Sequence, residues 1–83
     1  MSFRHNPGDP LTQAEREVWA LASAGLTNQE ISEIRSTALA TTKAQMMAVM
    51  AKLDASSRVR ATIIYHNIGQ DQIVRALREG GAL

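Results

Sequence analysis

Basic side chains are the groups in this sequence whose type and spacing suggest chemistry with a partner. Five of them fall between positions 35 and 60, where Asp54 is the only acid, so this segment has a net charge of +4. The five are Arg35, Lys43, Lys52, Arg58 and Arg60. The preceding segment, positions 9–34, has a net charge of −4. A basic segment of this kind can meet a polyanion such as nucleic acid, although solvated surface charge produces the same pattern.

The sequence has few groups suited to catalysis or metal binding. It contains no cysteine, which excludes disulfides, thiol nucleophiles and cysteine-based zinc sites. Its two histidines, His5 and His66, lie far apart, and no cluster of carboxylates joins them. The sequence also shows no paired carboxylates, no nucleophile beside a base and no glycine-rich phosphate loop. We therefore expect neither an enzyme nor a metal or cofactor.

Length and composition indicate the size and the fold class of the domain that carries these basic groups. With 83 residues the chain has room for one domain. Hydrophobic residues make up 45% of it but aromatic residues only 4%, so the core must be aliphatic, which favours helices over sheets. No apolar run approaches the roughly 20 residues of a membrane span, and the first ten residues lack the apolar stretch of a signal peptide. We expect a soluble, cytoplasmic, all-α protein.

Two capping boxes predict the first two helices. In each of them a threonine is followed three residues later by a glutamate. The side chain of each residue then accepts a hydrogen bond from the backbone N–H of the other. The pairs are Thr12–Glu15 and Thr27–Glu30. Gly25 is placed to end the first helix in a left-handed conformation, and the second helix is expected to stop near residue 35 or 36. Ile31 and Ile34 of the second helix are expected to point inward.

A third helix is predicted from about residue 39 to residue 53 by apolar positions at helical spacing. Its expected buried face comprises Leu39, Thr42, Met46, Val49, Met50 and Leu53. Its expected outer face comprises Ala40, Lys43, Ala44, Met47, Ala48 and Ala51. This outer face carries few polar groups for a surface that meets water.

Two shorter helices are expected in the C-terminal third. Ser56 is placed to cap a fourth helix that reaches about His66. A fifth helix is expected from about residue 70 to residue 79, where Gly80 and Gly81 follow. The turn-rich first ten residues predict a flexible arm. The chain is therefore divided into an arm at 1–10, a helical domain at 11–68 and a helical extension at 69–83.

Two sequence blocks in one ungapped frame carry a family resemblance. The first runs from Gly25 to Ile31 as Gly-Leu-Thr-Asn-Gln-Glu-Ile, and the second joins Lys52-Leu53 to Ser57-Arg58. With these blocks, residues 11 to about 65 resemble the LuxR/FixJ/GerE family of bacterial four-helix DNA-binding domains. The resemblance implies a four-helix helix-turn-helix domain whose third helix lies in the major groove of duplex DNA. The additional short C-terminal helix follows that domain.

The resemblance also implies roles for single residues of the third helix. Thr41 at its start would hold a backbone phosphate, and Lys43, Ala44 and Met47 would face base edges. Elementary chemistry agrees in part, because a lysine can donate to guanine and apolar groups can touch a thymine methyl. Basic residues near this helix are candidates for phosphate contacts, which position a protein without reading sequence. These candidates are Lys52, Arg58 and Arg60.

In that family the fourth helix would serve as a dimer contact. Apolar side chains left over in the C-terminal third support a homodimer, whose two third helices would lie about one DNA turn apart and require an inverted repeat. The candidate dimer residues are Val59, Ile63, Ile64, Ile73, Val74 and Leu77. In the alternative, the fifth helix folds back over the fourth helix of the same chain.

Departures from the family pattern leave a second function open. Arg35 stands where a buried leucine is usual, so its charge must reach the surface or pair with a carboxylate such as Glu33. Ala38 stands where a serine usually caps the third helix, so Ser36 or Thr37 is expected to cap it instead. Together with the sparsely polar outer face, these departures favour one alternative to DNA binding. It is a protein-interaction module on a helix-turn-helix fold that binds a transcription component or another protein partner rather than DNA.

Overall fold

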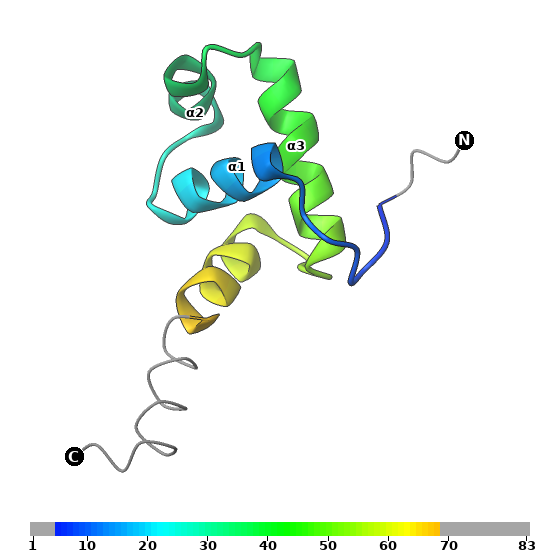
Figure 1. The fold of residues 1–83 in the computed structure, drawn as a ribbon. Helices are drawn as coiled ribbons and strands as arrows, with labels where there is room; N and C mark the ends of the chain where they lie inside the picture. Colours follow the sequence, from blue (N-terminus) through cyan, green and yellow to red (C-terminus); the bar gives the residue numbers. More distant parts are fainter. Residues whose placement is uncertain (1–4, 69–83) are drawn as a thin grey trace, which may run out of the picture.

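A computed structural model of the chain describes residues 5–68. Three helices carry labels in Figure 1: α1 (Gln13–Ser23), α2 (Asn28–Arg35) and α3 (Leu39–Lys52). Residues 58–68 form a fourth helical segment, drawn in yellow to orange, and no strand occurs within residues 5–68. The expected all-α, four-helix architecture is thus confirmed. The expected fifth helix, at 70–79, lies outside the described residues.

Both predicted capping boxes are present. Thr12 Oγ1 accepts from the backbone N–H of Glu15 (3.1 Å), and the Glu15 carboxylate accepts in return from the backbone N–H of Thr12 (2.9 Å). Thr27 and Glu30 exchange the same pair of bonds at 3.2 and 2.8 Å. Gly25 follows α1 with a φ of +97°, and its N–H bonds back to the last turn of that helix. The local signals therefore set the ends of α1 and the start of α2 as predicted.

The turn between α2 and α3 differs from the expectation. α2 ends at Arg35, and Ser36 follows in the left-handed region with a φ of +53°. The N-cap residue of α3 is Ala38, and no side chain caps this helix, so the prediction that Ser36 or Thr37 caps it is wrong. Both residues are used elsewhere. The backbone N–H of Ser36 closes the end of α2, and the Thr37 hydroxyl lies 3.3 Å from the hydroxyl of Thr42.

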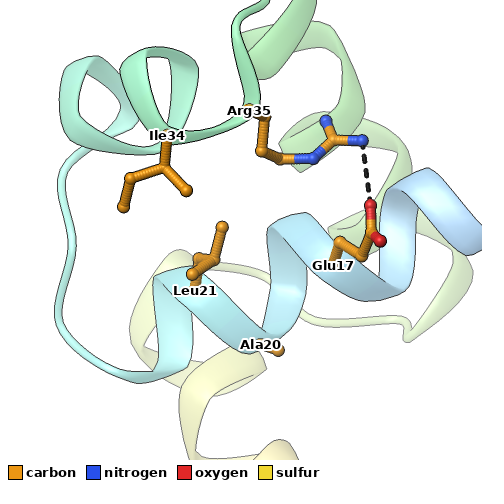
Figure 2. A pocket seen from close by; sticks show the side chains of 5 residues that line it. All are labelled: Glu17, Ala20, Leu21, Ile34 and Arg35. Carbon is orange, nitrogen blue, oxygen red and sulfur yellow. Dashed lines mark hydrogen bonds and ion pairs between the residues drawn. The ribbon is translucent and has the colours of Figure 1, made fainter.

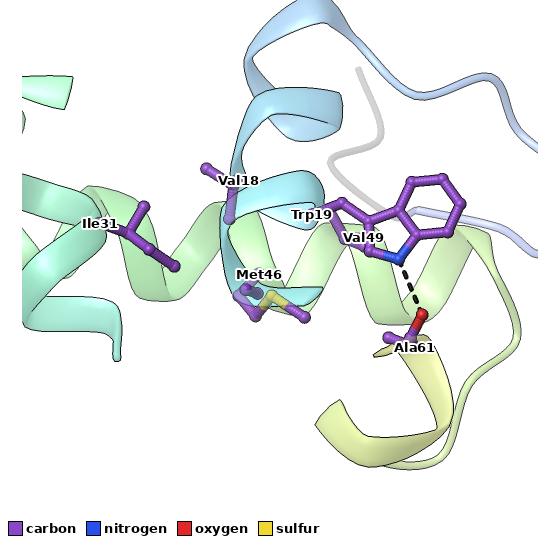
Figure 3. Packing of buried hydrophobic residues seen from close by; sticks show 7 residues of the cluster. Val18, Trp19, Ile31, Met46, Val49 and Ala61 are labelled. Atoms are coloured by element: carbon purple, nitrogen blue, oxygen red, sulfur yellow. Dashed lines mark hydrogen bonds between the residues drawn. The ribbon is translucent and has the colours of Figure 1, made fainter. Parts of the chain in front are cut away.

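One aliphatic core joins all four helical segments around Trp19 (Figure 3). Its buried members are Val18, Trp19, Ala22, Ile31, Met46, Val49 and Ala61. The Trp19 indole N–H donates to the backbone carbonyl of Ala61 at 2.8 Å, and the ring of Tyr65 packs edge-on against the indole. These contacts hold the 58–68 segment against α1. The long α3 packs against both α1 and α2, so only its opposite face is left for solvent (Figure 1).

For two side chains, helical periodicity predicted the wrong degree of burial. Ile34 is 61% exposed rather than inward, because the short α2 buries only Ile31 and Ser32. Ala48 was expected on the outer face of α3 but is only 3% exposed. Ala48 lies on the side of α3 that is covered by the N-terminal arm, residues 5–10. The backbone N–H of Gly8 in this arm donates to the last carbonyl of α3 at 2.8 Å.

The start of the fourth helical segment is shifted by one residue from the prediction. Ser57, and not Ser56, provides the cap, because its Oγ accepts from the backbone N–H of Arg60 at 3.2 Å. The backbone carbonyl of Ser57 also accepts from Ala61, which begins the helical ladder. In the helix that begins here, Ala61 is fully buried and its carbonyl accepts from Trp19.

Candidate nucleic-acid interface

The outward face of α3 gathers four of the residues predicted to contact DNA. Thr41, Lys43, Ala44 and Met47 are all exposed, and they lie opposite the buried Met46 and Val49 of the same helix. Met47 is 67% exposed, although it is a large apolar side chain. The face therefore combines a hydroxyl, a flexible cation and two apolar contact groups on one rigid helix. These groups can donate to base or phosphate oxygens and touch methyl groups.

Lys52 belongs to a buried ion pair rather than to this exposed face. Its Nζ lies 2.6 Å from Oε1 of Glu15, and the two side chains are 9% and 8% exposed. Burial raises the pKa of Glu15, but hydrogen bonds from Lys52 and Thr12 outweigh burial and hold that pKa below its ordinary value. Lys52 thus ties the end of α3 to the start of α1. We leave it out of the candidate interface, because its charge is already neutralised.

The two arginines of the fourth segment have different surroundings. The guanidinium of Arg58 donates to Oδ1 of Asn28 at 2.6 Å and also to the backbone carbonyl of Leu26. Arg58 therefore fixes the start of α2 to the fourth segment. Arg60 is exposed, and within residues 5–68 its side chain has no hydrogen-bond or ion-pair partner. Of these two arginines, Arg60 is the one placed to meet a phosphate.

Arg35 links three helices through side chains, and Figure 2 shows its pairing with Glu17 of α1. Its Nη2 lies 3.2 Å from Oε2 of Glu17 in α1, and its Nη1 donates to Oε1 of Gln45 in α3 at 3.0 Å. Arg35 is thus paired with a carboxylate, as expected, but the partner is Glu17 and not the example Glu33, which accepts from Gln29 at 3.0 Å. Sequence reasoning missed Glu17 because it lies 18 residues away and meets Arg35 only in the folded chain. The Arg35 side chain is 15% exposed, so its charge is both paired and largely covered.

The fourth segment leaves one apolar flank uncovered. Val59 and Ile63 are 68% and 44% exposed, whereas Ile64 packs against the core. Of the two apolar flanks of this segment, the one with Ile64 seals the domain, and the one with Val59 and Ile63 is left over. The other candidate dimer residues, at positions 73, 74 and 77, lie outside the described residues.

A shallow hollow of about 490 Å³ lies between α1 and α2, away from the outward face of α3 (Figure 2). Ile34 and Leu21 point toward each other across it, the pair of Glu17 and Arg35 lies at one end, and Ala20 also lines it. No residue of this hollow was predicted as a binding residue, because Ile34 was assigned to the core. An apolar surface with a charged rim is typical of a site for a protein partner.

The histidines and carboxylates of the described residues are not arranged for metal binding. Within residues 5–68, no group of three or more such side chains is placed to hold a metal ion. His66 Nε2 lies 3.0 Å from the backbone carbonyl of Ser23 at the end of α1, while His5 lines a hollow beside α3. In the same described range, no helix is long and apolar enough to cross a membrane.

Comparison with known proteins assigns the family. Residues 9–65 match the family described as bacterial regulatory proteins, luxR family. The transcriptional regulatory protein LiaR of Bacillus subtilis (strain 168) is 35% identical over 60 residues, which cover 72% of this chain but only 28% of LiaR. No solved structure matches the chain. The chain therefore belongs to the luxR family of bacterial regulatory proteins, a class of DNA-binding transcription regulators.

Proposed function

We propose that the chain regulates transcription by binding duplex DNA with α3 in the major groove. The observation that carries the proposal is the outward face of α3, where Thr41, Lys43, Ala44 and Met47 stand exposed on a helix fixed by the core. A helix of this kind fits the major groove, in which each base pair presents a distinct pattern of donors, acceptors and methyl groups. Such a regulator acts in the cytoplasm, where bacterial DNA lies.

Each side chain of this face has a role set by its chemistry. Lys43 donates to guanine O6 or N7, while Ala44 and Met47 contact thymine methyl groups. The hydroxyl of Thr41 donates to a phosphate oxygen at the start of the helix, and Arg60 meets a phosphate from the fourth segment. The phosphate contacts set the register of the helix, and the three central side chains of α3 select the sequence.

The proposal includes a homodimer formed through the fourth segment. Its uncovered flank, Val59 and Ile63, gives each subunit an apolar strip that a second copy can bury. The apolar residues Ile73, Val74 and Leu77 of the extension at 69–83 add to this strip in the proposal, while Ile64 supports it from the core side. Two subunits related by a two-fold axis present their α3 helices about 34 Å apart, so the site is an inverted repeat.

A binding titration with one matched control tests the DNA-binding role. Lys43→Ala is expected to weaken binding to a selected site by about 1–3 kcal/mol and to change the preferred sequence. Arg16→Ala removes the same charge from the exposed face of α1, next to Trp19 and Tyr65, and is expected to bind like the parent. Fluorescence anisotropy with random and genomic duplexes measures both. If the two variants lose affinity equally, α3 is not the element that reads DNA.

The hollow between α1 and α2 favours a second candidate function, the docking of a protein from the transcription machinery. Ile34 is 61% exposed at its edge, and among the large apolar side chains of α1, α2 and α3 only Met47, at 67%, is more exposed. Ile34→Gln keeps the size of the side chain but removes its apolar surface. If docking is the function, this variant loses partners in a pull-down with purified transcription components while DNA binding is unchanged. If DNA binding is the only function, neither property changes.

A further inference from the structure

Gln45 and Arg35 form a unit that the predicted interface does not include. Gln45 lies on α3 four residues after Thr41, at the flank of the outward face, and its side chain is half-buried. Its amide accepts from the guanidinium of Arg35 at 3.0 Å, and the same guanidinium is held by Glu17 at 3.2 Å. We propose that Gln45 is a further DNA-contacting residue, which donates to a phosphate oxygen, and that Arg35 is the positioning residue that orients its amide.

The orientation of the amide follows from the chemistry of its partner. An arginine guanidinium carries only donors, so the atom of Gln45 that faces it must be the carbonyl oxygen. The amide nitrogen is then the end left for another acceptor, and the described residues provide none for it. A glutamine without this contact can present either its oxygen or its nitrogen to a ligand. Arg35 removes that choice and leaves two N–H donors, which suit a phosphate.

The surroundings of Gln45 place those donors next to the proposed phosphate contact of Thr41. Both side chains line one hollow of about 430 Å³ beside α3, together with Ala44, His5 and Glu15, whose carboxylate is paired with Lys52. Residues four apart on a helix are neighbours on its surface, so one phosphate can accept from Thr41 and Gln45 at the same time. The hollow has room for that group, since its α3 wall consists largely of alanines.

The order of the contacts also favours donation. Glu17 fixes Arg35, Arg35 donates to the carbonyl of Gln45, and Gln45 donates outward. In such a chain each hydrogen bond polarises the next, so the amide nitrogen becomes a better donor than that of an isolated glutamine. The positive charge of Arg35 stays paired with Glu17 and does not itself reach the DNA. The contact therefore strengthens binding without the counterion release that a lysine or arginine would add.

The inference rests on the proposed function and is tested by variants that separate the two. Gln45→Ala is expected to lower affinity for every duplex by about tenfold or more, which is the worth of one hydrogen bond to a charged acceptor. The slope of log affinity against log salt is expected to stay unchanged, because no charge is removed. Gln29→Ala, the same change on exposed α2, is the control and is expected to bind like the parent.

A double-mutant cycle tests whether Arg35 acts through Gln45. Arg35→Met is expected to weaken binding severalfold in the parent but to have no further effect in the Gln45→Ala background, since the amide it orients is gone. Glu17→Gln, which loosens Arg35 without removing it, is the second variant in case Arg35→Met does not fold. Circular dichroism confirms the fold of each variant before binding is measured by anisotropy.

The outcomes are distinct for the inference and for the proposed function. If Lys43→Ala weakens binding but Gln45→Ala does not, the inference is overturned and the major-groove role of α3 stands. If the effects of Gln45→Ala and of Arg35→Met add in full, Arg35 does not act through Gln45 and its positioning role is overturned. If the parent binds no duplex, the proposed function fails and this inference fails with it.

Discussion

The buried pair of Lys52 and Glu15 offers the sharpest test of how the fold is held. The pair joins the end of α3 to the start of α1, with 2.6 Å between Nζ and Oε1 and both side chains below one-tenth exposed. Lys52→Met keeps most of the aliphatic stem but leaves the Glu15 carboxylate buried without its cation. Truncating one partner of a buried pair costs about 3–5 kcal/mol.

The magnitude is large for a domain of this size. Small domains are stable by roughly 5 kcal/mol or a little more, so Lys52→Met is expected to leave a marginal fold with a melting temperature more than about 10 °C lower. Adding Glu15→Gln is expected to restore much of the loss. It removes the buried charge, and glutamine at this position of α1 still completes the capping box with Thr12.

The assay is urea or thermal unfolding followed by the fluorescence of Trp19, the single tryptophan, which is 8% exposed in the folded chain. Lys43→Met on the outward face of α3 is the matched control and is expected to change the free energy of unfolding by less than about 0.5 kcal/mol. A loss below about 1 kcal/mol for Lys52→Met, or no recovery on adding Glu15→Gln, would refute the argument that the pair is buried and mutually dependent.

Four further predictions concern pH, core, dimer and salt. Because the pKa of Glu15 is lowered in the folded chain, its carboxylate stabilises the fold fully above about pH 4.3, and this stabilisation is lost as pH falls through the lowered pKa. The stability of Glu15→Gln, measured by acid unfolding, is expected to lack this pH dependence. Trp19→Phe leaves a core carbonyl without its donor and is expected to cost at least about 1–3 kcal/mol by urea unfolding followed by circular dichroism. Val59→Glu is expected to shift sedimentation toward the monomer, and an unchanged dimer would place the interface elsewhere. With Lys43 and Arg60 as the basic contacts, log affinity is expected to fall with log salt at a slope of about −2 per subunit, and a slope near −4 would mean that more basic groups bind DNA.

Local sequence signals predicted the helices, because their causes lie within a few residues. A threonine with a glutamate three positions later satisfies orphan backbone groups whatever the rest of the chain does, and both such boxes are present. The same holds for Gly25, whose φ of +97° favours a residue without a side chain. Where two hydroxyls compete locally, as at Ser56 and Ser57, the sequence does not decide between them, and the prediction was one residue off.

The partners of the charged side chains could not be predicted, because they come from other helices. Glu15 looked like a capping residue only, yet it also pairs with Lys52 across the domain. The sequence predicted that Arg35 would pair with a carboxylate, for example Glu33 nearby in the chain. In the folded chain Glu33 accepts from Gln29, and the partner of Arg35 is Glu17 of α1. Periodicity also placed Ile34 inside, since it does not reveal that α2 is too short to bury two isoleucines.

The partners of the basic residues at positions 35–60 show that this segment has a structural role as well. Within the described residues, Arg35, Lys52 and Arg58 are each engaged in holding one helix to another. Carboxylates inside the domain therefore neutralise two of these five positive charges, those of Arg35 and Lys52. Arg58 is held by neutral acceptors and keeps its charge, but its guanidinium is committed to the junction of α2 and the fourth segment. Nonspecific attraction to DNA scales with the phosphates neutralised, so each basic group of residues 5–68 that is paired with a carboxylate lowers it. In the proposed function, affinity would therefore come from close contacts of the outward face of α3, from the neutral donor Gln45 and from the doubling of these contacts in the proposed dimer.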